Sequence, residues 1–287
     1  MGDKVSIIGT GRMGSAAAKR LAAKGYQLIL WNRTKAKAEK LARELNAIVA
    51  RSPFDAVQEA RYAILFLADE DSIYSVLSTF RRLDGAVIIN SATVTPHAST
   101  RFYEFVKSLG GCYVEAPVLG GPSAVEKGRA LFVVSGERLC VNAAKPLLDD
   151  LAGEAIVVGE EPEKAAALKL AFNSLLIGNL QLLAEAALLS ESYGVDASVF
   201  KEVLGKTVFA SIVEKYLDRM KRDPHEPASF TLKLAMKDLD YAVRAGFYKG
   251  IAEPAISATL NTYRLAVKHG FSESDYTRIY HMLKGKD

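Results

Sequence analysis

The chain has 287 residues, of which 49% are hydrophobic, and this is enough for two domains with a hydrophobic core each. Its 37 basic and 33 acidic residues leave a formal charge of only +4 and are spread along the chain, which excludes the clustered basic surface of most nucleic-acid-binding proteins. Because the first residues lead directly into a strand-like run, without the pattern of a signal peptide, we expect a cytoplasmic protein.

The N-terminal half alternates short β-branched runs with amphipathic stretches up to about Gly159, which is typical of a doubly wound, mostly parallel sheet. Between the runs, apolar residues three and four apart, often followed by Gly or Asn, indicate helices that cover both faces of the sheet. We therefore predict an α/β domain over residues 1–161. The seven strand-like runs lie at residues 4–8, 27–31, 62–67, 86–90, 112–116, 131–135 and 155–158.

Strand signals stop after Pro162, and residues 162–287 read as helices separated by glycine and proline, so we predict an all-α second domain. Its first segment, residues 162–193, predicts one unusually long helix that connects the domains or packs against a second subunit. The apolar part of this segment, residues 170–183, is short and interrupted by polar side chains. We therefore predict a buried helix of a soluble protein, with no membrane partner.

Cysteine and histidine do not indicate a metal site. The two cysteines, Cys112 and Cys140, lie in a strand-like and a helix-like stretch, with no further ligand at metal-binding spacing. The four histidines are scattered, and no two of them have metal-ligand spacing. We therefore expect two reduced core thiols and no bound metal.

A glycine motif follows the first strand-like run. Gly9, Gly11 and Gly14 form G-x-G-x-x-G between that strand and an alanine-rich helix, where glycines permit a tight turn, close approach of a pyrophosphate and close helix packing. The N–H groups and the dipole of the helix attract the phosphates. We predict a Rossmann domain that binds a dinucleotide; the alternative is a glycine turn without a ligand. Further residues assigned to the cofactor site are Arg12, Met13, Leu67 and Ala68.

The second strand-like run ends in Asn32, Arg33 and Thr34, where an NAD site usually carries an acidic residue for the ribose 2′-hydroxyl. Arg33 can bind a 2′-phosphate bidentately, and Asn32 and Thr34 can add neutral hydrogen bonds. We therefore predict NADP(H) as the cofactor. The alternative is that Arg33 is a solvated loop residue and the cofactor is NAD(H).

Lys169 and Asn173 lie four residues apart on one face of a largely apolar helix. Burial disfavours an ammonium ion and lowers its pKa toward neutrality, where a lysine can donate and accept a proton. We predict Lys169 as the proton-transferring residue beside the reacting oxygen, with Asn173 orienting the substrate or the lysine. The alternative is that Lys169 extends to solvent and Asn173 belongs to a polar seam.

Three further segments are candidate ligand sites. Gly120 and Gly121 open a short helix-like stretch whose N–H groups suit a substrate carboxylate, although a simple glycine turn is the alternative. Thr93 follows the fourth strand-like run, at the edge of the sheet where such domains bind ligands, and we place it near the nicotinamide. Lys237 lies one turn after Lys233, and a solvated helix face is the alternative to a cofactor contact.

Four blocks of the chain resemble the β-hydroxyacid dehydrogenase family, which includes 3-hydroxyisobutyrate dehydrogenase and glyoxylate/succinic semialdehyde reductase. The resemblance extends along the whole chain and implies a Rossmann domain, a long interdomain helix and a helical C-terminal domain that often dimerises. The blocks are the glycine motif with Asn32-Arg33-Thr34, the segment Glu115–Gly121, Lys169-x-x-x-Asn173, and Lys233 with Lys237-Asp238.

The resemblance also implies site residues. Lys169 and Asn173 match the catalytic motif, although Ala165 stands where a glycine usually opens it. Lys237 resembles a cofactor contact, and Phe230 resembles a wall of the active site, although a core phenylalanine is the ordinary explanation.

The segment Glu115–Gly121 resembles the substrate loop of the family, and the resemblance implies substrate contacts for its residues Leu119, Gly120 and Gly121. The family commonly has serine at the position of Leu119, so a hydroxyl contact to the substrate is missing here and the usual substrates are in doubt.

The sequence therefore predicts an NADP(H)-dependent oxidoreductase that interconverts a small, carboxylate-bearing β-hydroxyacid and its aldehyde or keto form. We expect a homodimer or a higher homo-oligomer. One alternative is an imine-reducing enzyme of the same architecture, suggested by Leu119 and opposed by Lys169. The other is a non-catalytic NADPH-binding scaffold, which loss of the catalytic lysine would suggest.

Overall fold

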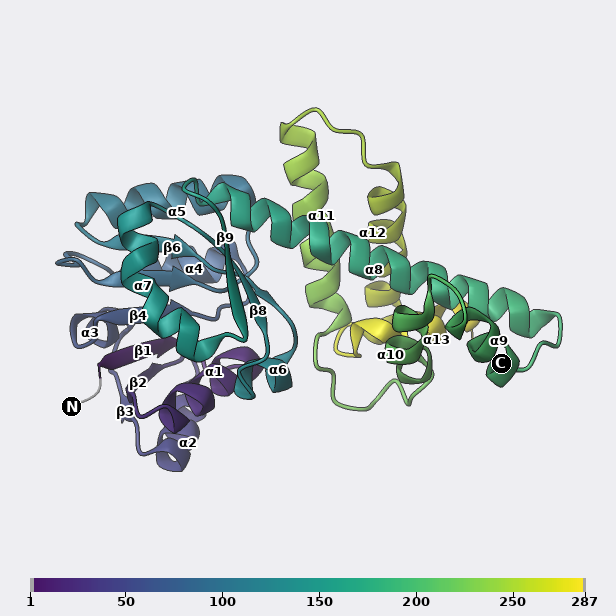
Figure 1. Cartoon of the computed structure of the whole chain (residues 1–287), viewed down its shortest axis with the longest axis horizontal. Helices are drawn as coiled ribbons and strands as arrows, with labels where there is room; N and C mark the ends of the chain where they lie inside the picture. The colour runs from purple at the N-terminus through teal and green to yellow at the C-terminus, as the bar shows by residue number, and fades with distance from the viewer. Residues whose placement is uncertain (1–2, 286–287) are drawn as a thin grey trace. The chain divides into compact units, whose positions relative to one another are not determined.

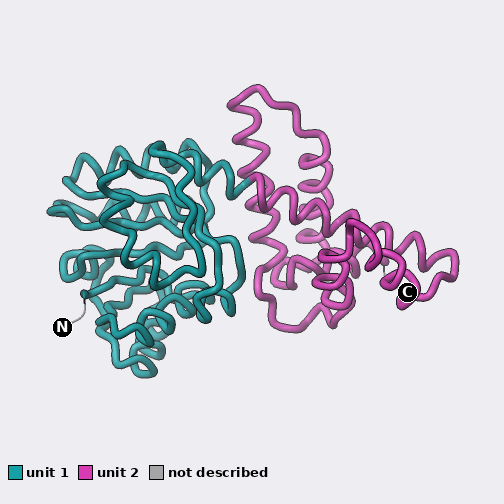
Figure 2. Tube along the Cα trace, viewed as in Figure 1, with its two compact units in different colours: residues 1–170 teal, residues 171–287 magenta. Residues whose placement is uncertain are grey.

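The computed structural model describes residues 3–285, and the chain divides into two compact units, residues 1–170 and 171–287 (Figure 2). Unit 1 contains a single mixed sheet with the strand order β3-β2-β1-β4-β5-β6-β8-β7, and β9 pairs with β8 (Figure 1). The strands are β1 (Lys4–Ile8), β2 (Gln27–Trp31), β3 (Ile48–Val49), β4 (Tyr62–Leu65), β5 (Val87–Asn90), β6 (Cys112–Glu115), β7 (Val118–Leu119), β8 (Leu131–Ser135) and β9 (Glu154–Gly159).

The strands from β3 to β6 run parallel, whereas β8 is antiparallel to β6 and β7. All seven strand-like runs of the sequence form strands, which confirms the predicted doubly wound sheet. Six of them could be recognised because strands buried on both faces are apolar nearly throughout, whereas β9 is an apolar run that is largely exposed. The sequence did not indicate β3 and β7, which are two residues long each and too short to show a pattern.

Helices cover both faces of this sheet, as predicted. Alternate residues of β4 show how: Ile64 packs in a cluster with α1, α2 and α7, whereas its neighbour Leu65 packs with α4 and α5. The helices of unit 1 are α1 (Arg12–Ala23), α2 (Lys35–Leu45), α3 (Pro53–Gln58), α4 (Glu70–Leu77), α5 (Pro96–Ser108), α6 (Pro122–Glu126) and α7 (Arg138–Leu151).

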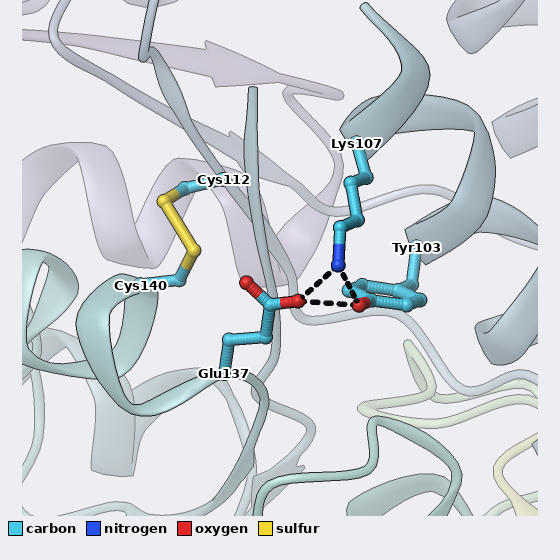
Figure 3. Close-up of a disulfide and its surroundings, with 5 residues drawn as sticks. All are labelled: Tyr103, Lys107, Cys112, Glu137 and Cys140. Carbon is cyan, nitrogen blue, oxygen red and sulfur yellow. Dashed lines mark hydrogen bonds and ion pairs between the residues drawn. A yellow bond between two sulfur atoms is a disulfide. The ribbon is translucent and has the colours of Figure 1, made fainter. Parts of the chain in front are cut away.

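The two cysteines form a disulfide, so the expectation of two reduced thiols is wrong. Cys112 begins β6 and Cys140 lies in the first turn of α7, and their Cα atoms are 5.2 Å apart although 28 positions separate them in sequence. Packing of α7 against the sheet creates this proximity, and the spacing of the cysteines gives no sign of it. Beside the disulfide, Glu137 accepts hydrogen bonds from Lys107 and Tyr103 of α5 (Figure 3).

Unit 2 is helical, as predicted, and α8 (Glu163–Ser192) runs from unit 1 into it. Its core contains Ile177 and Leu180 of α8, Leu217 of α10 and Leu239 of α11. The remaining helices are α9 (Ala197–Gly205), α10 (Ala210–Met220), α11 (Leu232–Tyr248), α12 (Pro254–Ala266), the short π-helix η1 (Val267–Phe271), the short 3-10 helix η2 (Tyr276–Arg278) and α13 (Ile279–Lys284).

Helix α8 is long and apolar enough to cross a membrane, a property that core helices of soluble proteins share. Ile177 and Leu180 on one side of it are completely buried. On another side Leu175, Leu182 and Leu189, which are seven residues apart, have 69%, 64% and 64% of their surface exposed. The prediction of a buried helix is therefore correct for one side only.

Candidate active site

The glycine motif forms the turn between β1 and α1. Gly9 has φ +99°, and a Cβ atom there would lie 2.2 Å from the carbonyl oxygen of Phe66. A Cβ atom on Gly14 would lie 1.8 Å from the carbonyl oxygen of Gly9, so the helix could not approach the strand. A Cβ atom on Gly11, by contrast, would meet no atom within 4 Å, which leaves the open space that a pyrophosphate needs.

The carboxyl ends of the parallel strands bring several predicted cofactor residues to one edge of the sheet. Strand β1 lies between β2 and β4, so the order of the strands reverses there and a dinucleotide site is expected. Leu67 and Ala68 follow β4, and half-buried Thr93 follows β5. Arg12 and Met13 form the first turn of α1.

Two buried hydroxyl groups at this edge lack a hydrogen-bond partner among residues 3–285: Thr10 Oγ1 in the glycine turn and Ser91 Oγ after β5. Buried polar atoms are nearly always hydrogen-bonded in a complete structure, so both hydroxyls fit a site for a polar ligand. Neither residue was assigned to the site from the sequence. Their positions next to Gly9 and before Thr93 were the only available signal.

The loop after β2 holds Asn32, Arg33 and Thr34, from which the sequence predicted NADP(H) rather than NAD(H). Asn32 Oδ1 accepts a hydrogen bond from Thr10 N (3.1 Å), and Asn32 Nδ2 donates to Thr34 O (3.0 Å), so this side chain ties the loop to the glycine turn. Arg33 is exposed, and within residues 3–285 its guanidinium forms no hydrogen bond or ion pair. Thr34 is the N-cap of α2, without a side-chain capping bond, and the first turn of α2 has no acidic residue.

The predicted substrate loop connects β6 to α6 and includes β7. Gly120 has φ +149°, a conformation that only glycine adopts readily, and Gly121 is the exposed N-cap residue of α6. Lys169 is half-buried, and its Nζ donates a hydrogen bond to the carbonyl oxygen of Val118 (2.7 Å). This contact places the lysine ammonium beside the backbone of the loop that contains Leu119.

A buried carboxylate lies beneath this edge of the sheet. Glu115 is the last residue of β6, and its side chain accepts hydrogen bonds from Ser99, Tyr113 and Asn90. Burial raises the pKa of Glu115 to about 7, and the three hydrogen bonds lower it in part. Glu115 was named from the sequence only as the start of the segment that resembles the substrate loop, and no role was assigned to it, although a glutamate inside the apolar run of residues 112–116 was a visible signal.

In unit 2, Asn173 belongs to a buried polar group with residues of α11. Asn173 Nδ2 donates to Asp238 Oδ2 (2.6 Å), and Lys237 Nζ lies 3.0 Å from Asp238 Oδ1 and 4.6 Å from the centre of the Tyr241 ring. Asp238 is 2% exposed and therefore needs these partners. Asp238 was named from the sequence only as part of a motif and was not assigned to the site. Lys233 is exposed.

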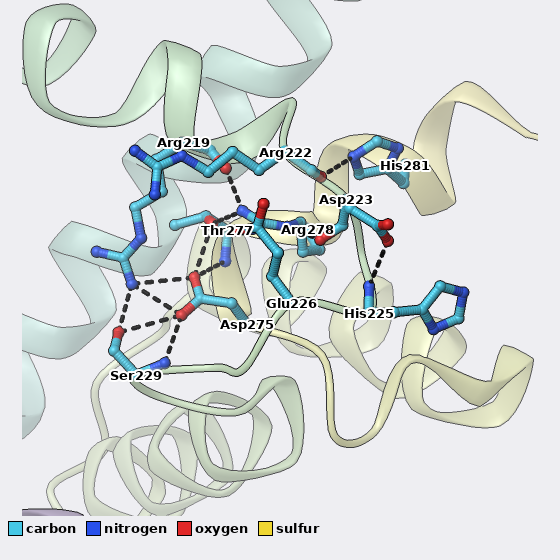
Figure 4. Close-up of polar contacts among 10 residues, drawn as sticks. All are labelled: Arg219, Arg222, Asp223, His225, Glu226, Ser229, Asp275, Thr277, Arg278 and His281. Carbon is cyan, nitrogen blue, oxygen red and sulfur yellow. Dashed lines mark hydrogen bonds and ion pairs between the residues drawn. The ribbon is translucent and has the colours of Figure 1, made fainter.

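Phe230 precedes α11 and is half-buried, with its ring 5.1 Å from that of Tyr276. Its segment is held by Asp275, whose carboxylate accepts hydrogen bonds from Ser229 N (2.9 Å) and Arg219 (2.8 Å) (Figure 4). Buried Arg278 supports the same region through the carbonyl oxygen of Asp223. Within residues 3–285, no group of three or more His, Cys, Asp or Glu side chains is arranged to hold a metal ion.

Known families match both parts of the chain. Residues 4–159 match the NAD binding domain of 6-phosphogluconate dehydrogenase. Residues 164–283 match the family described as NAD-binding of NADP-dependent 3-hydroxyisobutyrate dehydrogenase. An uncharacterized oxidoreductase of Bacillus subtilis, YfjR, is 31% identical over 98% of this chain and 100% of its own length. The chain belongs to the β-hydroxyacid dehydrogenase family.

Other members of the β-hydroxyacid dehydrogenase family match over nearly the whole chain. Glyoxylate/succinic semialdehyde reductase 2 of Arabidopsis thaliana is 27% identical, over 98% of this chain and 79% of the relative. The structure of Mycobacterium tuberculosis 3-hydroxyisobutyrate dehydrogenase with L-serine has the same fold, with a TM-score of 0.84 and 23% identity over 99% of this chain and 100% of that one. The predicted resemblance is confirmed, and the chain is an oxidoreductase with a domain for a nicotinamide dinucleotide.

Proposed function

We propose that this chain is an NADP(H)-dependent enzyme that interconverts a small β-hydroxyacid, or a related hydroxy acid, with its aldehyde or keto form. The observation that carries the proposal is the position of Lys169, whose Nζ is 2.7 Å from the backbone of the predicted substrate loop at Val118. A nicotinamide bound in the Rossmann domain supplies or accepts the hydride. The residues of the chain bind the substrate and move the proton.

Lys169 is proposed as the general acid and base. When a carbonyl compound is reduced, its oxygen gains negative charge and needs a proton, and the ammonium group of Lys169 can stabilise that charge and donate the proton from Nζ. In the oxidative direction the neutral amine takes the proton from the hydroxyl group. Positioned acid-base catalysis of this kind contributes roughly 10² to 10⁴ in rate.

The loop residues beside Lys169 are proposed to hold the carboxylate of the substrate. Gly120 and Gly121 have no side chains that would block the approach of a small acid to the backbone N–H groups. Asn173 is proposed to orient the substrate, and its bond to Asp238 fixes the plane of its amide. Phe230 is proposed as an apolar wall, and Thr93 and Lys237 as cofactor contacts.

The preference for NADP(H) over NAD(H) is part of the proposal, because the family includes enzymes of both kinds. One relative is named an NAD-dependent L-serine dehydrogenase. In this chain the loop after β2 has no carboxylate that would repel a 2′-phosphate, and Arg33 and the first turn of α2 add only positive or neutral groups. A 2′-phosphate beside the N-terminus of α2 would be stabilised by the charge of Arg33 and by the N–H groups of the first helical turn.

A panel of substrates tests the proposal. The loss of NADPH absorbance is followed with glyoxylate, succinic semialdehyde and other small aldehyde and keto acids, with NADH in parallel. We expect turnover of at least one acid, with NADPH as the better cofactor. If NADPH binds and no acid is reduced, the proposed reaction is wrong.

Leu119 favours a second candidate function. An apolar side chain stands where the family commonly offers a hydroxyl group, and this suits a less polar substrate such as an imine. Imine reductases share the fold, since the structure of one from a Pseudomonas species matches with a TM-score of 0.68 and 23% identity. A cyclic imine is therefore included in the panel. If the cyclic imine is the only compound of the panel that is reduced, imine reduction replaces the proposed hydroxyacid reaction.

A homodimer is also proposed, with the exposed apolar stripe of α8 as the contact between two copies. The stripe consists of Leu175, Leu182 and Leu189, each more than 60% exposed, and apolar side chains aligned along one side of a helix form the kind of patch that marks an interaction surface. A second copy of the same helix offers the same apolar spacing, so the stripe can bury itself against its own equivalent.

A further inference from the structure

Strands β5 and β6 end side by side on a fully buried polar pair. Asn90 and Glu115 are register partners, and neither side chain has exposed surface. Asn90 Nδ2 lies 3.0 Å and 3.2 Å from the two carboxylate oxygens of Glu115. Oε2 of Glu115 also accepts hydrogen bonds of 2.6 Å from Ser99 Oγ of α5 and from Tyr113 Oη. The carboxylate therefore connects two strands and a helix.

Asn90 extends this connection to the segments that follow both strands. Its Oδ1 accepts a hydrogen bond from Ala92 N (3.2 Å), and its carbonyl oxygen accepts one from Ala116 N (2.7 Å). The first bond holds the turn of residues 91–93, which contains the unpartnered hydroxyl of Ser91 and the predicted nicotinamide contact Thr93. The second holds the start of the predicted substrate loop.

Burial of the Glu115 carboxylate at this position is energetically unfavourable. Its partners are neutral, and within residues 3–285 no Lys or Arg side chain forms an ion pair or a hydrogen bond with its carboxylate. A buried carboxylate without a cation loses much of its hydration energy, and an apolar side chain of similar volume would avoid that loss. An apolar side chain could not, however, fix the amide group of Asn90.

We propose that Glu115 is a positioning residue of the active site, which acts through Asn90 to hold residues 91–93 in the conformation that receives the nicotinamide end of the cofactor. The proposal rests on the proposed function for the assignment of Thr93 and extends it to a residue that does not touch the ligands. Glu115 sets the orientation of the Asn90 amide. Asn90 in turn sets the backbone of the turn.

Three variants separate positioning from a general structural role. Glu115→Leu removes both carboxylate oxygens that accept these hydrogen bonds, whereas Glu115→Gln keeps one oxygen as an acceptor for Asn90. Tyr113→Phe removes one hydroxyl group and leaves the bond between Glu115 and Asn90 in place. The readouts are hydrogen exchange of the Ala92 amide without ligand, the dissociation constant of NADPH measured by fluorescence, and kcat and KM for a substrate from the panel. The melting temperature of each variant is measured alongside.

We expect Glu115→Leu to increase the exchange rate of the Ala92 amide and the dissociation constant of NADPH by about tenfold each, the equivalent of one lost hydrogen bond. Peptides from β1 and β4 should keep their protection. Glu115→Gln and Tyr113→Phe should stay within about threefold of the wild type in both readouts. In Glu115→Leu, kcat should fall by more than KM changes, because the hydride donor is misplaced.

The proposal is overturned if Glu115→Leu folds and leaves both the exchange of the Ala92 amide and the affinity for NADPH unchanged. It is equally overturned if Tyr113→Phe increases Ala92 exchange and weakens NADPH binding as much as Glu115→Leu does. The bond between Glu115 and Asn90, which Tyr113→Phe keeps, would then not matter. If Glu115→Leu does not fold, Glu115→Met replaces it, since methionine keeps the length of the side chain without an oxygen acceptor for Asn90. The same increase in Ala92 exchange is expected, and its absence contradicts the proposal.

Exchange and NADPH binding need no turnover. A failure of the substrate panel would therefore overturn the proposed function and leave this inference to be decided by those two measurements.

Discussion

At the scale of a single residue, Arg33 is proposed to select NADP(H) over NAD(H). If its guanidinium binds the 2′-phosphate, Arg33→Ala should raise the dissociation constant of NADPH by about 10- to 100-fold, which corresponds to one or two lost charge-assisted hydrogen bonds. The dissociation constant of NADH should stay within about threefold, because NADH has no phosphate there. Arg43→Ala, a change of the same charge in the last turn of α2, serves as the control. Equal losses for both cofactors would refute the assignment.

Glu115 should make the stability of the protein depend on pH. Burial raises its pKa from 4.5 to about 7, so between these values the folded chain holds a proton that the unfolded chain has released. Stability should therefore fall as the pH rises through this window, by roughly 3 kcal/mol from this residue. Glu115→Gln cannot ionise, so its urea midpoint should decrease less between pH 5 and pH 8. If the urea midpoints of the wild type and of Glu115→Gln change with pH in the same way, the pKa of Glu115 is not raised by burial.

The sequence allowed the prediction of site residues whose role follows from local spacing. Gly9 and Gly14 occupy positions where a Cβ atom would collide with backbone, and Lys169 contacts the backbone of the predicted substrate loop. Glu115 and Asp238 were not assigned, because each has a partner from another element, Ser99 for Glu115 and Asn173 for Asp238, that only the fold brings close. A carboxylate inside an apolar run indicates that such partners exist, but it does not identify them.

At the scale of secondary structure, the pattern of apolar residues was sufficient for the seven longer strands and for α8. It failed for the disulfide, because Cys112 and Cys140 come together only when α7 packs against the sheet. The same limit applies to β7, a two-residue strand whose pairing with β8 depends on the course of the loop around it.

The disulfide should stabilise the packing of α7 against β6. It joins residues 28 positions apart, and closing a loop of that length in the unfolded chain should be worth about 2–4 kcal/mol. Cys140→Ser should therefore lower the free energy of unfolding by that amount. A reductant should destabilise the wild type and leave the variant unchanged. If the wild type unfolds at the same urea concentration with and without reductant, the disulfide contributes nothing.

At the scale of the whole molecule, the apolar stripe of α8 predicts self-association. Leu182→Glu would place a charge in the centre of the proposed contact, and desolvation of that charge should convert the dimer to a monomer. Light scattering after size-exclusion chromatography measures the mass directly. Lys40→Glu, at an exposed position of α2 in unit 1, is the control and should remain dimeric. A wild type that is monomeric at micromolar concentration would contradict the proposed interface.

Proton transfer by Lys169 can be measured as the rate of NADPH oxidation in a single turnover with the best acid of the panel. Lys169→Ala should lower this rate by about 10²- to 10⁴-fold, with the affinity for NADPH nearly unchanged. Lys164→Ala removes an exposed lysine of the same helix that pairs with Glu161, and it should react like the wild type. A Lys169→Ala enzyme that reacts within about threefold of the wild type would show that another group transfers the proton.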